Sequence, residues 1–390
     1  MSSTALSQLP QKEQDPLEKV YQSLRTVERT KDYKDFYSYL KSTRIPFIPC
    51  DERKAGTMYR ECFKVLHGMG QISIPVAVAL SMHYYMLAAL AAYPLSKKST
   101  SYWKREMLLA KIKKERLLIA NTGSVRTFKD TAENSGILAR KEKGYYTIQG
   151  KAPFMSLAGV ADYVVFAAEL PSGEKAVFFV PLDNDQIEFE HTAFGDSMQG
   201  SFTKAVKFKN LRVGHANVLS LPDSQASNCE ILVYQRAWFQ ALIPAPYLGA
   251  TSEVLSCAKA FAKKKIKNGK SLAASENFQG RVGELLIKYR AAQQLCEHTG
   301  AAMDDFKRGD RISLKKLFES SVLSKHFSTH FAEEIVTQVR YLMGSQFLLP
   351  GTLTNKVYKE IVFGALQPMS DTDIKDYFAR AFMDPCKLSF

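Results

Sequence analysis

The chain has 390 residues, 46% of them hydrophobic and 11% aromatic, so it can bury a large core and is not a disordered protein. Lys and Arg number 53 against 39 Asp and Glu, which gives a formal net charge of +14. Aromatic residues do not alternate with the basic clusters as they do in a nucleic-acid-binding groove. We therefore expect no nucleic-acid partner, and instead an acidic one such as a phosphate-bearing cofactor or an acidic carrier protein. Alternatively, the basic surface only aids solubility.

The termini, the cysteines and the apolar runs predict a cytoplasmic protein. The first sixteen residues contain no apolar signal core, and the six cysteines form no CxxC motif and no close pair. The longest apolar run, residues 74–95, is interrupted by Ser81, His83 and three tyrosines. We expect it to be a buried helix and not a membrane span, so no membrane partner is predicted.

Residues 1–117 are predicted to form an N-terminal α-helical domain. Apolar residues recur at helical spacing over 16–40 and 57–95, and a helix rich in Lys and Arg is expected over 102–118. Residues 118–222 are predicted to form a central antiparallel β domain, because apolar runs such as 163–166 and 177–180 are separated by turn residues.

From residue 223 to 390 the pattern is again helical and predicts a C-terminal four-helix bundle domain. The first helix, over 230–262, is expected to be broken or kinked by Pro244 and Pro246, since proline removes a helical hydrogen bond. The next two helices are expected over 278–307 and 314–341. The predicted fold class is therefore α+β, with a β module between two helical blocks.

Two segments near the β module resemble motifs of the acyl-CoA dehydrogenase family. GYYTIQGKAPFMSLAGVADYVVF is similar to a strand-turn-strand of that family, in which Phe154 and Ser156 would contact the flavin. NTGSVR resembles a shortened form of a family loop that retains Ser124. Thr122 and Ser124 also offer hydroxyl and backbone N–H groups suited to a phosphate or a ring carbonyl.

Two segments of the helical C-terminal block extend this resemblance. KIKNGKSLAASENFQ is similar to a family motif in which Lys265 replaces an arginine that binds a pyrophosphate and Gln279 is kept. YLMGSQFL is similar to a glycine-rich motif with Gly344 and Ser345 in place of paired glycines. The resemblance implies one FAD per subunit, with Lys265 and Gln279 serving the FAD of a neighbouring subunit. A homodimer or homotetramer is the expected assembly.

The glutamate that the family uses to remove a substrate proton is missing at both positions where it occurs. Pro368 or Met369 stands at one and Gln235 at the other, and a glutamine cannot accept a proton at neutral pH. Asp371 is the nearest carboxylate and is our tentative catalytic residue. Alternatively, it caps a helix that starts at Thr372.

Three functions follow from this pattern. The chain could be an FAD-dependent oxidoreductase of acyl-CoA dehydrogenase type that acts on an acyl or aminoacyl thioester, bound to coenzyme A or to a carrier protein. It could be a reduced-flavin-dependent monooxygenase of the same fold, which needs no such glutamate. It could also be a catalytically silent scaffold subunit.

Three histidines require a separate interpretation. His326 and His330 are four residues apart and could face one side of a helix as metal ligands, but nothing else in the sequence indicates third and fourth ligands. No metal is therefore predicted. His83 lies where the family carries a substrate-side histidine, and it could equally be a hydrogen-bonded residue inside the helical bundle.

Overall fold

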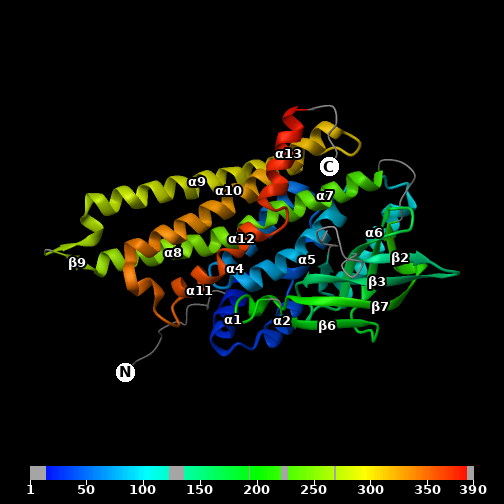
Figure 1. Cartoon of the computed structure of the whole chain (residues 1–390), viewed down its shortest axis with the longest axis horizontal. Helices are drawn as coiled ribbons and strands as arrows, with labels where there is room; N and C mark the ends of the chain where they lie inside the picture. The colour runs from blue at the N-terminus through cyan, green and yellow to red at the C-terminus, as the bar shows by residue number, and fades with distance from the viewer. Residues whose placement is uncertain (1–14, 123–135, 193, 221–226, 268, 384–390) are drawn as a thin grey trace, which may run out of the picture.

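The computed structural model describes residues 15–122, 136–192, 194–220, 227–267 and 269–383 (Figure 1). The α+β class and the predicted order of helices, central sheet and helices are confirmed, while the exact domain boundaries remain predictions. The N-terminal helices are α1 (Pro16–Thr30), α2 (Tyr33–Ser42), α3 (Ile48–Asp51), α4 (Ala55–Gly70), α5 (Ile74–Ala92) and α6 (Thr100–Glu115).

The helix predicted over 16–40 is in fact two helices. α1 ends where Lys31 adopts a left-handed conformation with φ of 67°, and the backbone N–H of Lys31 donates to the carbonyl of Val27. This is a common helix ending, but it usually uses glycine, so the sequence carried no signal for it. The reversal lets α2 pack back on α1 and bury Phe36 and Tyr37.

α5 is the central helix of the molecule. Within the described part of the chain it alone is long and apolar enough to cross a membrane, but most of its side chains are buried by the surrounding protein. It contacts α4, α7 and strand β1, so it joins the two helical blocks to the sheet. The prediction of a buried helix is therefore confirmed.

The central sheet has the strand order β6-β7-β3-β2-β4-β5-β8, with β1 paired to β4. Most pairs are antiparallel as predicted, but β1 and β2 each run parallel to β4, with Ile119 opposite Tyr163 and Leu138 opposite Glu169. The strands are β1 (Ile119–Thr122), β2 (Leu138–Lys141), β3 (Tyr145–Met155), β4 (Tyr163–Glu169), β5 (Lys175–Pro181), β6 (Ile187–Thr192), β7 (Lys204–Gly214) and β8 (Val218–Ser220).

Over the described residues from 227 to 383, the C-terminal block contains four long α-helices and three shorter ones. The predicted break at Pro244 is confirmed, because one helix ends at Leu242 and the next begins at Pro244. The helices are α7 (Ser227–Leu242), α8 (Pro244–Lys264), α9 (Glu276–Asp305), α10 (Arg311–Met343), α11 (Leu353–Glu360), α12 (Phe363–Leu366) and α13 (Asp371–Met383).

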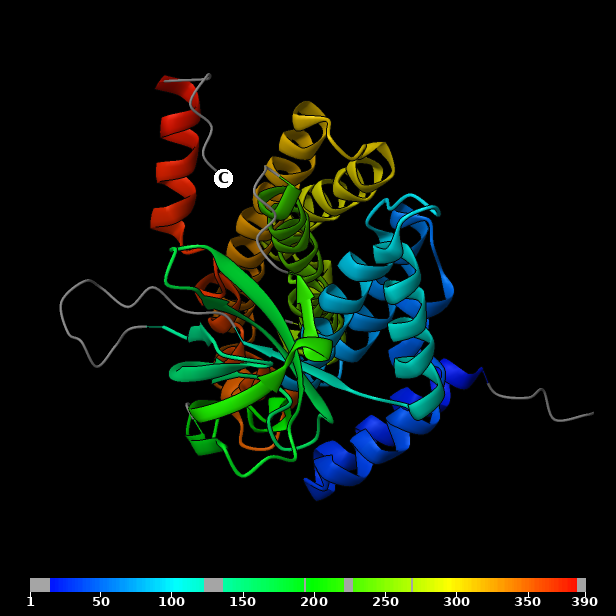
Figure 2. The same cartoon turned by 90° about the vertical axis from the view of Figure 1, so that its right-hand side faces the viewer.

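The sheet and the hairpin of β9 (Ile266–Lys267) and β10 (Lys270–Ser271) lie at opposite ends of the molecule. Figure 1 shows α8, α9 and α10 side by side, with β9 at their far end and the sheet at the other side. In Figure 2 the sheet faces the viewer, with the blue N-terminal helices at its lower right and α13 (red) above it. This arrangement separates the predicted site residues into distinct groups.

Candidate functional site

An apolar pocket of about 120 Å³ lies between α5, α6, α7 and the sheet. None of the described residues that line it carries a carboxylate, and Gln235 of α7 is its most polar side chain. The amide of Gln235 donates to the sulfur of Met86, so it is held by the pocket wall. The pocket is lined by Met86, Leu87, Ala89, Leu90, Tyr93, Leu95, Leu108, Ile112, Ile119, Val165, Val177, Phe179, Leu219, Ile231 and Gln235.

A polar network joins α5 to the end of β1 beside this pocket. The hydroxyl of Tyr85 donates to Asn121 Oδ1 at 2.7 Å, and Asn121 Nδ2 donates to the carbonyl of Met82 at 2.7 Å. Tyr85 also packs edge-on against Phe239 of α7, with ring centroids 5.1 Å apart. Sequence reasoning missed Tyr85, because its contact with Asn121 spans 36 residues and has no local signal.

Three of the predicted flavin-binding residues lie at the ends of two strands: Thr122 ends β1, Phe154 is near the end of β3, and Ser156 follows β3. Thr122 Oγ1 donates to the carbonyl of Phe154 at 3.1 Å, which ties β1 to β3. The Phe154 ring is 49% exposed and stacks on Phe194, with centroids 5.4 Å apart and planes at 7°. The hydroxyls of Ser156 and Thr203 are hydrogen bonded at 2.9 Å. Ser124, the fourth predicted residue here, lies outside the described residues.

Lys265 and Gln279 lie on a different part of the chain. Lys265 ends α8 immediately before β9, and its carbonyl accepts a hydrogen bond from the N–H of Leu272. Gln279 Nε2 donates to the carbonyl of Ala273. Lys265 and Gln279 are therefore both hydrogen bonded to the segment 272–273, which directly follows the hairpin of β9 and β10. Because that hairpin lies at the end of the molecule away from the sheet (Figure 1), the two residues do not join Phe154 within one chain.

Gly344 and Ser345 follow α10 and begin the short helix η6 (Gly344–Leu348). Gly344 ends α10 with φ of 64°, a left-handed conformation that favours glycine, and its N–H donates to the carbonyl of Arg340. Gly344 therefore ends a helix, and this structural role does not depend on whether the motif binds a ligand.

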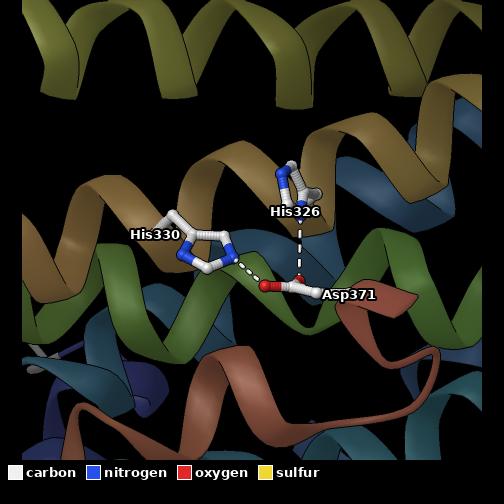
Figure 3. A group of neighbouring side chains, drawn as sticks. All are labelled: His326, His330 and Asp371. Carbon is white, nitrogen blue, oxygen red and sulfur yellow. Dashed lines mark hydrogen bonds and ion pairs between the residues drawn. The ribbon is translucent and has the colours of Figure 1, made fainter. Parts of the chain in front are cut away.

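The tentative catalytic residue, Asp371, is the first residue of α13 and faces two histidines of α10 (Figure 3). One carboxylate oxygen lies 3.1 Å from His326 Nδ1, and the other lies 2.8 Å from His330 Nε2. Burial opposes ionisation of Asp371, but the two histidines outweigh it and hold its pKa below the usual range. Burial and the neighbouring His330 lower the pKa of His326.

Two expectations about this cluster were wrong. Asp371 does not cap α13; the hydroxyl of Ser370 does, because it accepts a hydrogen bond from the N–H of Asp373 at 3.2 Å. The histidine pair does have a third potential ligand, the carboxylate of Asp371. Asp371 is 41 residues beyond His330 in the sequence, but the fold places it beside the pair. A contact over that distance leaves no periodic trace in the sequence.

Lys325 fixes the segment that leads into Asp371. Its buried ammonium group donates to the carbonyls of Ala365 and Met369, each at 3.0 Å. Burial lowers the pKa of Lys325 to about 8, partly offset by Asp371. On the other side, Gln240 of α7 donates to the carbonyl of Pro368. The segment at the family's catalytic position is thus held between α7 and α10.

His83 is a structural residue. Its ring is fully buried, its Nδ1 accepts a hydrogen bond from the N–H of Ile119, and its Nε2 lies 3.0 Å from the carbonyl of Pro46. Burial lowers the pKa of His83 to about 4, so it is neutral at physiological pH. Of the two roles weighed for this histidine, the geometry supports the hydrogen-bonded one.

A second, polar cavity of about 820 Å³ lies between α1, α11 and the segment after β6. Glu360 lines it, is 6% exposed, and has one carboxylate oxygen with no hydrogen-bond partner in the described part of the chain. The ion pair of Lys356 with Glu28 lies beside it. Burial is the main cause that raises the pKa of Glu360, to about 7, and Glu28 adds to the increase.

Comparison with known proteins places these features in a family context. Residues 241–349 match the family model described as acyl-CoA dehydrogenase, C-terminal domain. The chain is 25% identical over 214 residues to an acyl-CoA dehydrogenase of Bacillus subtilis (strain 168), an alignment that covers 53% of this chain and 52% of that protein. The chain thus spans about half the length of the sequence relatives it matches.

Solved structures are similar over nearly the whole chain. FMN-bound TdsC from Paenibacillus sp. A11-2, a dibenzothiophene monooxygenase, has a TM-score of 0.78 at 13% identity and covers 95% of this chain and 96% of its own. Butyryl-CoA dehydrogenase from Megasphaera elsdenii has a TM-score of 0.75 at 14% identity and covers 96% and 100%. At these identities the likeness concerns the fold alone.

Proposed function

We propose that this chain, which belongs to the acyl-CoA dehydrogenase superfamily, is a flavin-dependent oxidoreductase that binds a small apolar group in the pocket between α5, α6, α7 and the sheet. The observation that carries this proposal is that pocket, whose walls are apolar apart from the amide of Gln235. A cavity of this size suits an aromatic ring or a short acyl chain.

The described residues fit a flavin. Phe154 exposes half of an aromatic ring from a strand, and a flat ring system would cover that surface. Thr122 donates to the carbonyl of Phe154, and Ser156 follows Phe154 by two residues, so both can supply hydroxyl groups near it. Ser124 is proposed to complete the set. When bound, a flavin supplies an acceptor or donor of electrons next to the substrate.

We infer that the flavin is FAD and that two or four chains share their sites. Lys265 and Gln279 lie at the far end from Phe154, which supports a role toward the cofactor of a neighbouring chain. The lysines around residue 265 would suit a pyrophosphate, which FAD has and FMN lacks. Gly344 and Ser345 are proposed to contribute to the same shared site.

The pocket supports the monooxygenase chemistry better than the thioester dehydrogenase chemistry. Removal of a substrate proton needs a base at the pocket, but no described lining residue carries a carboxylate and Gln235 remains an amide at neutral pH. Both oxygens of Asp371 already face histidines. A reaction in which reduced flavin activates oxygen does not need that base.

The thioester dehydrogenase remains the second candidate, because Asp371 is ionised and lies two residues beyond the family's catalytic position. In that case Asp371 is the base, and a substrate on coenzyme A or an acidic carrier protein would suit the net charge of +14. A cytoplasmic location is proposed for either enzyme.

The test begins with the visible spectrum of the purified protein, in which flavin bands are expected. Acyl thioesters are then added without oxygen, and in a separate assay apolar aromatic compounds are added with oxygen and externally reduced flavin. The monooxygenase predicts product only in the second assay, and Asp371→Asn should change its rate less than about twofold. Bleaching by a thioester that Asp371→Asn abolishes and Asp376→Asn preserves would establish the dehydrogenase. Colourless protein that gains no flavin on reconstitution would support the silent scaffold.

A further inference from the structure

His326, His330 and Asp371 converge on one point between α10 and α13 (Figure 3). The two histidines lie one turn apart on the same side of α10, and their ring centroids are 4.5 Å apart with planes at 63°. The rings therefore point at the carboxylate and do not stack on each other. One potential ligand atom from each residue lies within 4.8 Å of the other two.

We propose that these three side chains bind a divalent transition-metal ion. Imidazole nitrogen and carboxylate oxygen are the ligands that Zn²⁺ and its first-row neighbours take in proteins, at about 2.0–2.2 Å. In a tetrahedral site such ligand atoms are about 3.3 Å apart. His326 Nδ1 lies 3.1 Å from one oxygen of Asp371, and His330 Nε2 lies 2.8 Å from the other. One ligand atom from each of the three residues lies within 4.8 Å of the other two, so side-chain rotations that bring one oxygen toward both nitrogens would make room for an ion.

The site is open to the solvent. The side chains of His326, His330 and Asp371 are 22%, 38% and 35% exposed, so a hydrated ion can reach them and keep a water molecule in the fourth position. Three protein ligands with one open position is the arrangement of catalytic zinc sites.

The charges around the site limit the affinity. Asp371 supplies one negative charge, and Lys325, the residue before His326, supplies a nearby positive charge that opposes a cation. The carbonyls of Ala365 and Met369 accept the hydrogen bonds of Lys325 and offset part of that charge. The proposed ligands are two imidazole rings and one carboxylate. This set favours transition metals over Mg²⁺ and Ca²⁺, because imidazole is a poor ligand for those two ions.

This inference goes beyond the proposed function, since it needs neither the flavin nor the apolar pocket. A bound ion would fix α13 on the bundle and would occupy the carboxylate that the dehydrogenase chemistry requires. Metal binding is measured directly, so the outcome of this test does not depend on the outcome of the enzyme assays.

The experiment uses the full chain, isolated with its own cofactor and dialysed against a chelator. Zn²⁺ is titrated by calorimetry, and Co²⁺ is added to follow its absorption at wavelengths beyond the flavin bands. We expect one ion per chain and a Co²⁺ spectrum with nitrogen ligands. His330→Gln and Asp371→Asn should each weaken binding at least about tenfold. His298→Gln, which changes an exposed histidine of α9, should bind as the wild type does.

Mg²⁺ in place of Zn²⁺ should give no measurable heat at the same concentrations. Circular dichroism of each variant separates a lost ligand from a lost fold, and His330→Gln is the safer variant because its side chain is the most exposed of the three. The proposal is overturned if Zn²⁺ does not bind, or if binding is equally tight in His330→Gln and Asp371→Asn. In either case the three residues only hold α13 by hydrogen bonds.

Discussion

Glu360 shows how a single buried carboxyl can make stability depend on pH. Its pKa is about 7 in the folded protein, against 4.5 when exposed, because burial disfavours its charged form. Between these values the folded chain binds a proton that the unfolded chain has released. The contribution of Glu360 to the free energy of unfolding is therefore complete below pH 4.5. About 3 kcal/mol of it is lost as the pH rises through 7.

Glu360→Gln should remove this contribution. The stability of the variant relative to the wild type is expected to be higher at pH 8 than at pH 5, because an amide does not ionise and so carries no cost of burying a charge at high pH. Urea unfolding at a series of pH values measures the change. Glu284→Gln, which alters an exposed residue of α9, is the control and should follow the wild-type profile. Parallel profiles for wild type and Glu360→Gln would show that folding does not raise the pKa of Glu360.

His83 and Asp371 show the limits of assigning a role by position in a motif. Each stands at or near a position that carries function in the family, but His83 bonds two backbone groups and Asp371 faces two histidines. The same residue type at the same place in the chain can thus serve packing or chemistry. The hydrogen-bond partners decide between them, and those partners are distant in sequence.

At the scale of elements, the contact between α10 and the α12–α13 segment depends on Lys325. Its ammonium group is the described donor to the carbonyls of Ala365 and Met369, and it is buried on α10 among the hydroxyl groups of Ser321, Ser328 and Thr329. An unpaired buried carbonyl costs about 1–3 kcal/mol.

Lys325→Met should therefore destabilise the protein by about 2 kcal/mol or more, since it leaves two carbonyls without a donor while relieving the cost of burying one charge. We expect faster cleavage of the segment after Glu360 in limited proteolysis, together with a lower unfolding midpoint. Lys316→Met, at an exposed position of the same helix, removes only a solvent-exposed ion pair with Asp305 and should change both far less. Wild-type protease resistance in Lys325→Met would mean that other contacts hold α13.

At the scale of the whole molecule, the distance between the β9–β10 hairpin and the sheet has a consequence for assembly. If Lys265 binds the flavin of another chain, a monomer has an incomplete site. Light scattering should therefore give the mass of two or four chains for the coloured protein.

Lys265→Glu puts a negative charge where a pyrophosphate is proposed, so the flavin content should fall at least about tenfold while the fold is retained. Lys259→Glu makes the same charge change on α8, six residues earlier, and should keep its colour. A monomer that holds one flavin per chain, or a coloured Lys265→Glu protein, would contradict the shared site.

Local periodicity was enough to predict the order of helices, sheet and helices. A buried helix face and a buried strand face repeat at different spacings, and Pro244 and the apolar α5 have effects confined to their own neighbourhood. The same local signals placed His326 and His330 on one side of a helix. They did not reveal the end of α1 at Lys31, because a non-glycine residue in the left-handed conformation has no distinctive sequence.

Only the tertiary structure decided which distant segments meet. It brought Asp371 to the two histidines, Tyr85 to Asn121, and Gln235 into a pocket without a described carboxylate, and it set Lys265 apart from Phe154. These outcomes depend on how whole helices pack against each other and against the sheet. Packing is selected by the shape and burial of many side chains together, so no single stretch of the sequence encodes it.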